Sequence, residues 1–263
     1  MEIAGYIASV LIGISLGLIG GGGSVLTLPV LVYLFGIDTI TATTYSLFVV
    51  GASSLVGSVS YFKKGLINVN TATSFGIPSI MAVLLARHYL LPAIPEQLIN
   101  VGSFILTKSI VLMLLFAVLM VFAAYSMITK ETEEQPANQQ SASKAWVMVQ
   151  GFMVGIITGL IGAGGGFLII PALVNLLKLP VKTAIGTSLI IIALNSLTGF
   201  GFSLGKNHIN WSFLLTVTLI AMTGIFIGSY LSTKIDSRRL KPAFGWFVLV
   251  MGMYILLRET LLK

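Results

Sequence analysis

The sequence predicts an all-helical (all-α) polytopic membrane protein built from two homologous halves. Of the 263 residues, 56% are hydrophobic and only 9% are charged, and the mean hydropathy is +1.02. A soluble domain carries about 25% charged residues, which it needs to cover its surface. The composition therefore excludes a soluble enzyme. The net charge of +7 comes from basic residues that stand singly or in pairs between apolar runs, which disfavours nucleic acid as a partner.

Apolar runs fill most of the chain, and most of them approach the roughly 20 residues that a membrane-spanning helix needs. They are residues 3–35, 40–62, 71–86, 109–129, 146–177, 183–204, 211–233 and 242–257. The first and the fifth are longer than the others, and glycines interrupt each of them. We therefore divide the chain into a first transmembrane repeat (1–129), a polar linker (130–145) and a second transmembrane repeat (146–263).

The two halves are copies of one another. A shift of 142 residues aligns residues 17–68 with residues 159–210 without a gap, and 21 of the 52 aligned positions are identical. Apolar composition alone would align leucines, but it would not also align glycines, a lysine, an asparagine, and Pro29 with Pro171. Internal repeats of this kind are typical of secondary transporters.

The distribution of basic residues favours one of two topologies. If every apolar run crosses the membrane once, the 15 basic residues divide seven against eight. If each long run is a re-entrant hairpin, ten share one face, and the other face holds Arg87, Lys108, Lys206, Arg258 and Lys263. Because cytoplasmic loops are enriched in Lys and Arg, we expect the hairpins, a cytoplasmic linker and both termini outside. Each repeat then has three transmembrane helices, and the two copies are inverted repeats.

The glycine-rich interruptions are the first candidate site. They read GLIGGGGSVLTLPVL (17–31) and GLIGAGGGFLIIPAL (159–173). Clustered glycines disfavour a continuous helix, and irregular backbone at membrane depth survives only where it is buried in protein or lines a cavity. A helix that resumes after such a turn offers unpaired N–H groups and a positive dipole end to an anion. The alternative is close helix packing. The residues predicted to face a ligand are Gly22, Gly23, Ser24, Gly164, Gly165 and Gly166.

Polar side chains in the next apolar run of each half complete the predicted site. These runs contain Thr44, Ser46, Ser53 and Ser54 in the first half and Thr187, Ser188, Asn195 and Ser196 in the second. The ones predicted to bind are Ser46, Thr187, Ser188 and Asn195. An amide in hydrocarbon must find partners, and together with the hydroxyls it could replace the hydration shell of an anion. The alternative is that these groups bond to backbone carbonyls or across helices.

The acidic residues give no carrier for protons inside the membrane, because all eight are expected in loops or at the termini. They are Glu2, Asp38, Glu96, Glu131, Glu133, Glu134, Asp236 and Glu259. No His, Asp and Glu have the spacing of metal ligands, and no phosphate-binding GxxxxGK[ST] motif is present. We therefore expect no metal, no cofactor and no catalytic residues.

The doubled glycine-rich stretch, followed each time by Pro-x-Leu, resembles the TauE/SafE family of sulfite and sulfonate permeases. The resemblance covers essentially the whole chain. Its glycine motif stands at 20–24 (GGGGS) and at 162–166 (GAGGG), and its Gly-Thr-Ser stands at 186–188, whereas the first copy reads Thr-Tyr-Ser at 44–46. The resemblance implies transport of sulfur-containing anions across the plasma membrane.

Together, the residues and the resemblance predict a secondary transporter or facilitator in a bacterial plasma membrane. Its cargo would be a small anion, most simply a sulfur oxyanion or organosulfonate of the sulfite, thiosulfate or sulfoacetate type. The expected partners are this substrate and the lipid bilayer, and a homodimer is left open. The alternatives are a cation channel or carrier that uses the carbonyls of the unwound turns, and a membrane assembly factor that transports nothing.

Overall fold

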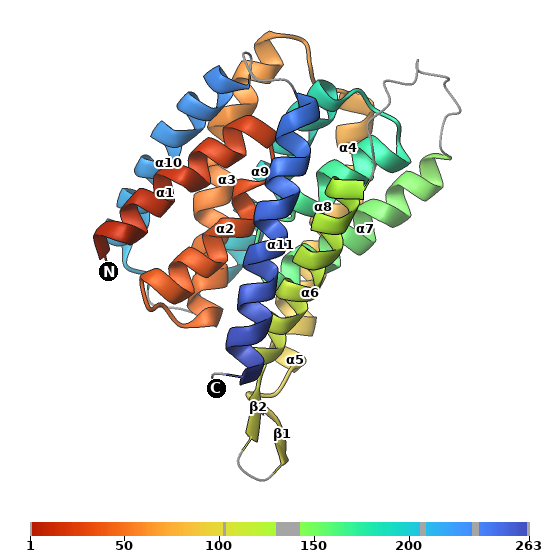
Figure 1. Ribbon diagram of the computed structural model, residues 1–263. Helices are drawn as coiled ribbons and strands as arrows, with labels where there is room; N and C mark the ends of the chain where they lie inside the picture. Colours follow the sequence, from red (N-terminus) through yellow and green to blue (C-terminus); the bar gives the residue numbers. More distant parts are fainter. Residues whose placement is uncertain (1, 102–103, 130–142, 206–208, 233–236, 262–263) are drawn as a thin grey trace.

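The computed structural model describes residues 2–101, 104–129, 143–205, 209–232 and 237–261 (Figure 1). The elements of the first half are α1 (Glu2–Ile19), α2 (Gly23–Pro29), the π-helical turn η1 (Val30–Leu34), α3 (Thr39–Lys63), α4 (Val69–Leu85), the π-helical turn η2 (Ala86–Leu90), α5 (Leu91–Ala93), β1 (Gln97–Val101), β2 (Phe104–Thr107) and α6 (Lys108–Thr129). Those of the second half are α7 (Lys144–Ile161), α8 (Gly166–Pro171), the π-helical turn η3 (Ala172–Leu176), α9 (Val181–Ser203), α10 (Trp211–Leu231) and α11 (Ser237–Leu261).

The helical class is confirmed, with one small exception. Strands β1 and β2 form an antiparallel hairpin in which Gln97 lies opposite Thr107. The segment is rich in β-branched residues and too short to cross a membrane as a helix. It therefore lies outside the predicted apolar runs, between 71–86 and 109–129. Within the described residues, six helices are long and apolar enough to cross a membrane: α3, α4 continued to Ala93, α6, α7, α9 and α10.

The first long apolar run folds back on itself. Helix α1 ends at Ile19, α2 starts at Gly23, and η1 returns toward the start of α1. As a result the rings of Tyr6 and Phe35 meet edge to face, with their centroids 5.3 Å apart. The second long run is broken at the equivalent place, between the end of α7 and the start of α8.

The two halves pack reciprocally. Helix α1 lies along α10 of the other half, and its counterpart α7 lies along α4; α3 packs on α9, and α6 on α11 (Figure 1). Two equivalent hydrogen bonds also connect the halves. The Asn210 N–H donates to the Tyr45 hydroxyl (2.7 Å), and the equivalent Asn68 N–H donates to Thr187 Oγ1 (3.0 Å). Each half therefore completes the packing of the other.

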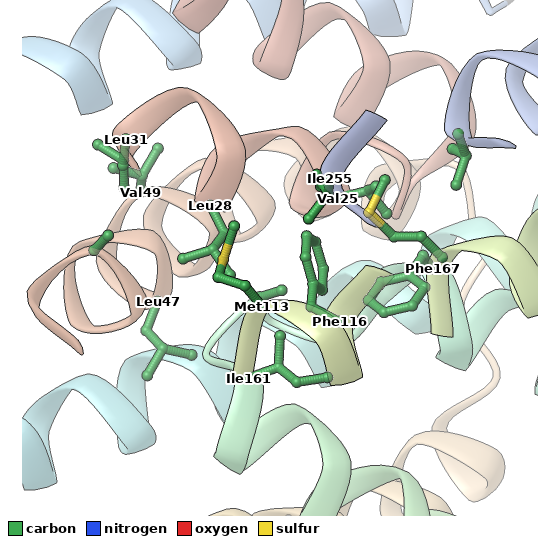
Figure 2. Close-up of a cluster of buried hydrophobic side chains, with 14 of the residues drawn as sticks. Val25, Leu28, Leu31, Leu47, Val49, Met113, Phe116, Ile161, Phe167 and Ile255 are labelled. Carbon is green, nitrogen blue, oxygen red and sulfur yellow. The ribbon is translucent and has the colours of Figure 1, made fainter. Parts of the chain in front are cut away.

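A hydrophobic core holds the two short helices α2 and α8 in place. Phe116 of α6 meets Phe167 of α8 edge to face, with centroids 5.9 Å apart. Val25 and Leu28 of α2 and Ile255 of α11 belong to the same buried cluster (Figure 2). The segments that follow the glycine turns are thus fixed from both halves of the chain.

Two helices extend further than the apolar runs predicted, and each extension contains a charged residue. The run 71–86 stops before Arg87, but the helix continues through η2 to Ala93, and Arg87 is buried. The run 242–257 stops before Glu259, but α11 continues to Leu261. Glu259 is fully buried, and its carboxylate accepts a hydrogen bond from Tyr33 (2.9 Å).

The run boundaries, which place Arg87 in a loop, are therefore wrong at this point. Glu259 lies near the C-terminus as expected, but it is inside a helix and buried. The physical reason is that a helix does not end at its first charged side chain when that side chain can turn toward the protein interior. The predicted linker (130–145) is also shorter at its end, because α7 begins at Lys144. Its residues 130–142 lie outside the described part of the chain.

Candidate functional site

The glycine turns of the two halves touch each other in the centre of the molecule. A Cβ on Gly21 would lie 2.8 Å from the Gly166 Cα, and a Cβ on Gly166 would lie 2.6 Å from the Gly21 Cα. Real Cβ atoms do not approach other atoms so closely, so only glycine at both positions permits this contact. The contact brings the two glycine motifs of the sequence into one region.

Neighbouring helices fill the space behind other predicted glycines. Gly22 is the buried N-cap of α2, in a right-handed conformation. Gly23 faces α1, where a Cβ would lie 2.5 Å from Leu16 Cγ. Gly165 has φ +69°, and a Cβ there would collide with Thr158 of α7. Close packing therefore accounts for Gly23 and Gly165, and a ligand role for them stays a prediction.

Gly164 lies against polar and apolar side chains of the central helices. It has φ +65°, and a Cβ on it would lie 2.6 Å from Val50 Cγ1 and 2.9 Å from the Ser196 hydroxyl. The second glycine turn therefore contacts both α3 and α9 at Gly164. These two are the most buried of the candidate membrane spans, each with 67% of its most apolar window inside the structure.

Three of the predicted hydroxyls have backbone partners. Ser24 donates to the carbonyl three residues before it (2.7 Å), and Ser188 does the same (2.8 Å). Thr187 accepts the N–H of Asn68 from the other half (3.0 Å). Ser and Thr hydroxyls in helices commonly bond to local backbone in this way.

Other polar atoms of α3 and α9 are buried and find no hydrogen-bond partner among the described residues. Ser46 and Asn195 are two of the predicted residues: the Ser46 hydroxyl is unpartnered, and Asn195 donates to Ser79 Oγ (2.6 Å) while its Oδ1 is unpartnered. The hydroxyls of Ser53, Ser54 and Ser196 are in the same state, and the prediction did not include them. Buried polar groups are normally hydrogen-bonded, so such a group set marks a place for a polar ligand or water.

Spacings of seven and eight residues are the signal for these residues: Ser54 follows Ser46 by eight, as Ser196 follows Ser188. Ser53 follows Ser46 by seven, as Asn195 follows Ser188, and residues two turns apart lie on one face of a helix. The sequence therefore placed a polar stripe on each central helix, but it did not show which hydroxyls would bond to their own backbone.

Arg87 was missed altogether. It lies on the π-helical turn η2 and is 4% exposed, whereas the following Tyr89 is 64% exposed. Its Nη2 lies against Gly162, the residue that ends α7 with φ +72° and begins the second glycine turn, so that a Cβ on Gly162 would collide with it. The signal in the sequence is an arginine directly after the apolar run 71–86, a position that the run boundaries place in a loop.

The polar contacts of Arg87 are few and long. Its Nη1 donates to Ser203 Oγ at 3.5 Å, and its Nη2 donates to the Thr43 carbonyl at 3.4 Å. Its Nε has no hydrogen-bond partner, and no carboxylate of the described residues forms an ion pair with it. The guanidinium is thus a buried positive charge with unused donors beside a glycine turn.

These features define a class of protein. A duplicated, multi-pass helical chain, with helices broken by glycines next to buried polar groups, has an architecture that occurs among membrane transporters. Among the described residues, no group of three His, Cys, Asp or Glu could hold a metal ion.

Comparison with known proteins gives the family. Residues 6–255 match the family described as "Sulfite exporter TauE/SafE". The chain belongs to this family, and it is a membrane transporter. The family is one of transporters and not of enzymes.

Several curated relatives match nearly the whole chain. A "Probable membrane transporter protein" of Xylella fastidiosa is 26% identical over 95% of this chain and 92% of its own length. The "Probable membrane transporter protein YunE" of Bacillus subtilis is 25% identical over 95% and 97%. YjnA of the same organism, with the same description, is 24% identical over 97% and 100%.

Proposed function

We propose that the protein is a secondary transporter or facilitator that moves a small sulfur oxyanion or organosulfonate across the plasma membrane. The observation that carries the proposal is the set of buried, unpartnered polar atoms on α3 and α9 where these helices meet the glycine turns. In a membrane protein such groups are costly and mark substrate pathways. A substrate that exchanges its hydration shell for these groups would satisfy them.

The sign of the charge follows from two further observations. The family description names sulfite. Arg87 contacts the second glycine turn, and no carboxylate of the described residues neutralises it. An anionic substrate fits both observations, and a cation fits neither. These observations support a substrate of the sulfite, thiosulfate or sulfoacetate type.

The mechanism that we propose uses the duplication. The reciprocal packing of α1 on α10 and of α7 on α4 supports a pseudo-twofold arrangement, and the fold-back of the first long run supports the hairpin topology. With both termini outside and the linker in the cytoplasm, the two halves would be inverted repeats, whose exchange of conformations gives alternating access. Export is the favoured direction, since a membrane potential supplies about 2.3 kcal/mol per 100 mV for each negative charge that leaves the cell.

Flux measurements test this function. The purified protein is reconstituted into liposomes, and uptake of labelled sulfite, thiosulfate and sulfoacetate is compared with uptake of rubidium and sodium ions. We expect at least one of the sulfur anions to move above the level of protein-free liposomes, at a rate that responds to an imposed potential. Movement of the cations alone would show a cation carrier, and movement of no ion would show an assembly factor; either result contradicts the proposal.

A matched pair of variants links the flux to the site. Ser196→Ala removes an unpartnered hydroxyl beside Gly164, whereas Thr198→Ala, two residues along the same helix, removes an exposed hydroxyl that bonds to its own backbone. We expect Ser196→Ala to slow anion flux and Thr198→Ala to leave it unchanged. Equal flux in the two variants would place the pathway elsewhere.

A further inference from the structure

Three features of Arg87 set it apart from an ordinary structural arginine. It is buried in a helix that is long and apolar enough to cross the membrane, its donors are largely unused, and it lies against the first glycine of the second turn. An arginine that stabilises a fold is normally paired with a carboxylate or caps several carbonyls at short distance. Here the two hydrogen bonds are 3.4 and 3.5 Å long.

An unpaired buried charge lowers the stability of the protein that carries it, because the lost hydration is not replaced. Charged residues inside membrane segments are accordingly rare and mark functional sites. What the Arg87 guanidinium lacks is an anion with oxygens that can accept its free N–H groups. That missing group has the chemistry of the proposed substrate.

We propose that Arg87 binds the transported anion directly, through two parallel hydrogen bonds to two oxygens of one sulfonate or sulfite group. The guanidinium has five N–H groups, of which Ser203 and Thr43 use two. The Nε–H and the remaining Nη–H groups form the planar fork that matches two oxygens of an oxyanion. This inference rests on the proposed function and names the residue that recognises the substrate.

Ser203 and Thr43 act as positioning residues. Ser203 Oγ donates to the Gly199 carbonyl (2.9 Å), which leaves its oxygen lone pair to accept from Arg87 Nη1. The Thr43 carbonyl holds Nη2 against the turn. Together they fix two corners of the guanidinium and leave the Nε side for the ligand.

The fork geometry also defines the selectivity. Sulfite, thiosulfate and sulfonates present two oxygens on one face, whereas chloride is a sphere and can satisfy only one direction at a time. We therefore expect oxyanions to bind more tightly than chloride, and a carboxylate probe such as acetate to compete through the same two-oxygen geometry.

Thermal stability and binding of purified variants test the proposal. Arg87→Met removes the charge, Arg87→Lys keeps the charge but not the fork, and Arg258→Met is the control. Arg258 stacks on the Tyr33 ring (4.0 Å from its centroid) and donates to the Tyr254 hydroxyl (3.4 Å). The probes are sulfite, sulfoacetate and chloride, and the readouts are the melting temperature without anion, the dissociation constant, and flux in liposomes.

The expected pattern separates binding from folding. Without anion, Arg87→Met should melt at the wild-type temperature or above it, because an uncompensated charge has been removed. Its affinity for sulfite or sulfoacetate should fall by about 10-fold to 150-fold, because the anion loses one charged hydrogen-bonding partner. Arg87→Lys should lie between wild type and Arg87→Met, and Arg258→Met should bind as wild type does.

Each other result overturns the inference. Wild-type affinity in Arg87→Met shows that the charge does not touch the substrate. If Arg87→Met does not fold, wild-type affinity in Arg87→Lys excludes the fork and leaves Arg87 a structural residue. If the wild-type protein itself binds and moves none of the oxyanions, the proposed function fails together with the inference, whereas normal flux in the Arg87 variants refutes the inference alone.

Discussion

The two glycine turns begin alike, and then they differ in backbone and in chemical surroundings: Gly22 is right-handed (φ −64°), whereas its counterpart Gly164 has φ +65°. Gly20 and Gly162 are equivalent under the 142-residue shift, and both have positive φ, +77° and +72°. The first turn packs on Ile185, whereas the second packs on Thr43 and on Arg87. Position 43 is the counterpart of position 185, so equivalent helices, α9 and α3, pack on the two turns, and the side chains at the contact differ in polarity.

The asymmetry extends to the helix that carries the charge. The counterpart of Arg87 is Ser229, and the counterpart of Ser203 is Tyr61. Ser229 lines a groove of about 270 Å³ between α3 and α10 that also includes Lys64 and the exposed Phe226. Duplication therefore preserved the arrangement of the helices in both halves, while within the described residues the buried arginine lies against the second turn.

The largest effect is expected when Arg87 and its counterpart Ser229 are exchanged, which tests whether the two turns can replace one another. In the double variant Arg87→Ser/Ser229→Arg the charge moves to the first turn. There the Ile185 carbonyl takes the place of the Thr43 carbonyl but already accepts from Ser188 (2.8 Å), and Tyr61 takes the place of Ser203. We expect oxyanion affinity to stay about 10-fold or more below wild type, as in Arg87→Ser alone. Equilibrium binding of labelled sulfite measures it. Recovery of wild-type affinity would mean that the halves are interchangeable.

The glycines that begin the turns give a matched pair with a somewhat smaller effect. Gly20→Ala and Gly162→Ala each force an alanine into positive φ, which costs about 1–2 kcal/mol of stability in both cases. Only Gly162→Ala also displaces the Arg87 guanidinium. We expect both to lower the melting temperature and only Gly162→Ala to lower sulfite affinity, by about tenfold. An equal loss of affinity in both would assign the site to the turns themselves.

Serine hydroxyls with and without partners should differ by less. The Ser196 hydroxyl is unpartnered, whereas Ser188 donates to a carbonyl of its own helix. We expect Ser196→Ala to weaken oxyanion binding by about fivefold, worth about 1 kcal/mol, with no loss of stability. Ser188→Ala should leave binding unchanged. Titration of both purified variants with sulfoacetate measures the two affinities. A larger effect of Ser188→Ala would show that the Ser188 hydroxyl belongs to the binding site.

The smallest effect is expected for the reciprocal hydrogen bonds between the halves. Tyr45→Phe removes the acceptor of the Asn210 N–H, and Thr187→Val removes the acceptor of the Asn68 N–H. Each variant should lose about 1 kcal/mol of stability and no oxyanion affinity. Denaturation in detergent, followed by binding, measures both. A loss of affinity in Thr187→Val alone would show that Thr187 also contacts the substrate.

The fold was largely predictable because it depends on features that sequence displays directly. Apolar run length set the helices, the glycine clusters set the breaks, and the shared Asn68 and Asn210 mark the starts of α4 and α10, where each side chain accepts a hydrogen bond from the backbone three residues later. The β1–β2 hairpin was not predicted, because its short segments have no strong periodic pattern. The burial of Arg87 and Glu259 within helices was not predicted, because the apolar runs were ended at the first charged residue.

The site was predictable only in part, for a physical reason. The sequence shows which residues are polar, but the direction of a hydroxyl depends on local backbone that the sequence does not reveal. Thus Ser24 and Ser188 bond to their own helices while Ser46 and Ser196 do not. The burial of Arg87 depends on contacts with Ser203, which lies 116 residues away along the chain.

Crystallography with a heavy oxyanion tests the central claim most directly. Selenite is a structural analogue of sulfite, and its selenium gives an anomalous scattering signal that locates the bound anion without a map of the light atoms. The account predicts one anomalous peak per chain, within hydrogen-bonding reach of the Arg87 guanidinium and beside Gly162, and no peak in crystals of Arg87→Met. A peak that persists in Arg87→Met, or one that lies at the first turn or beside Lys64, would contradict it.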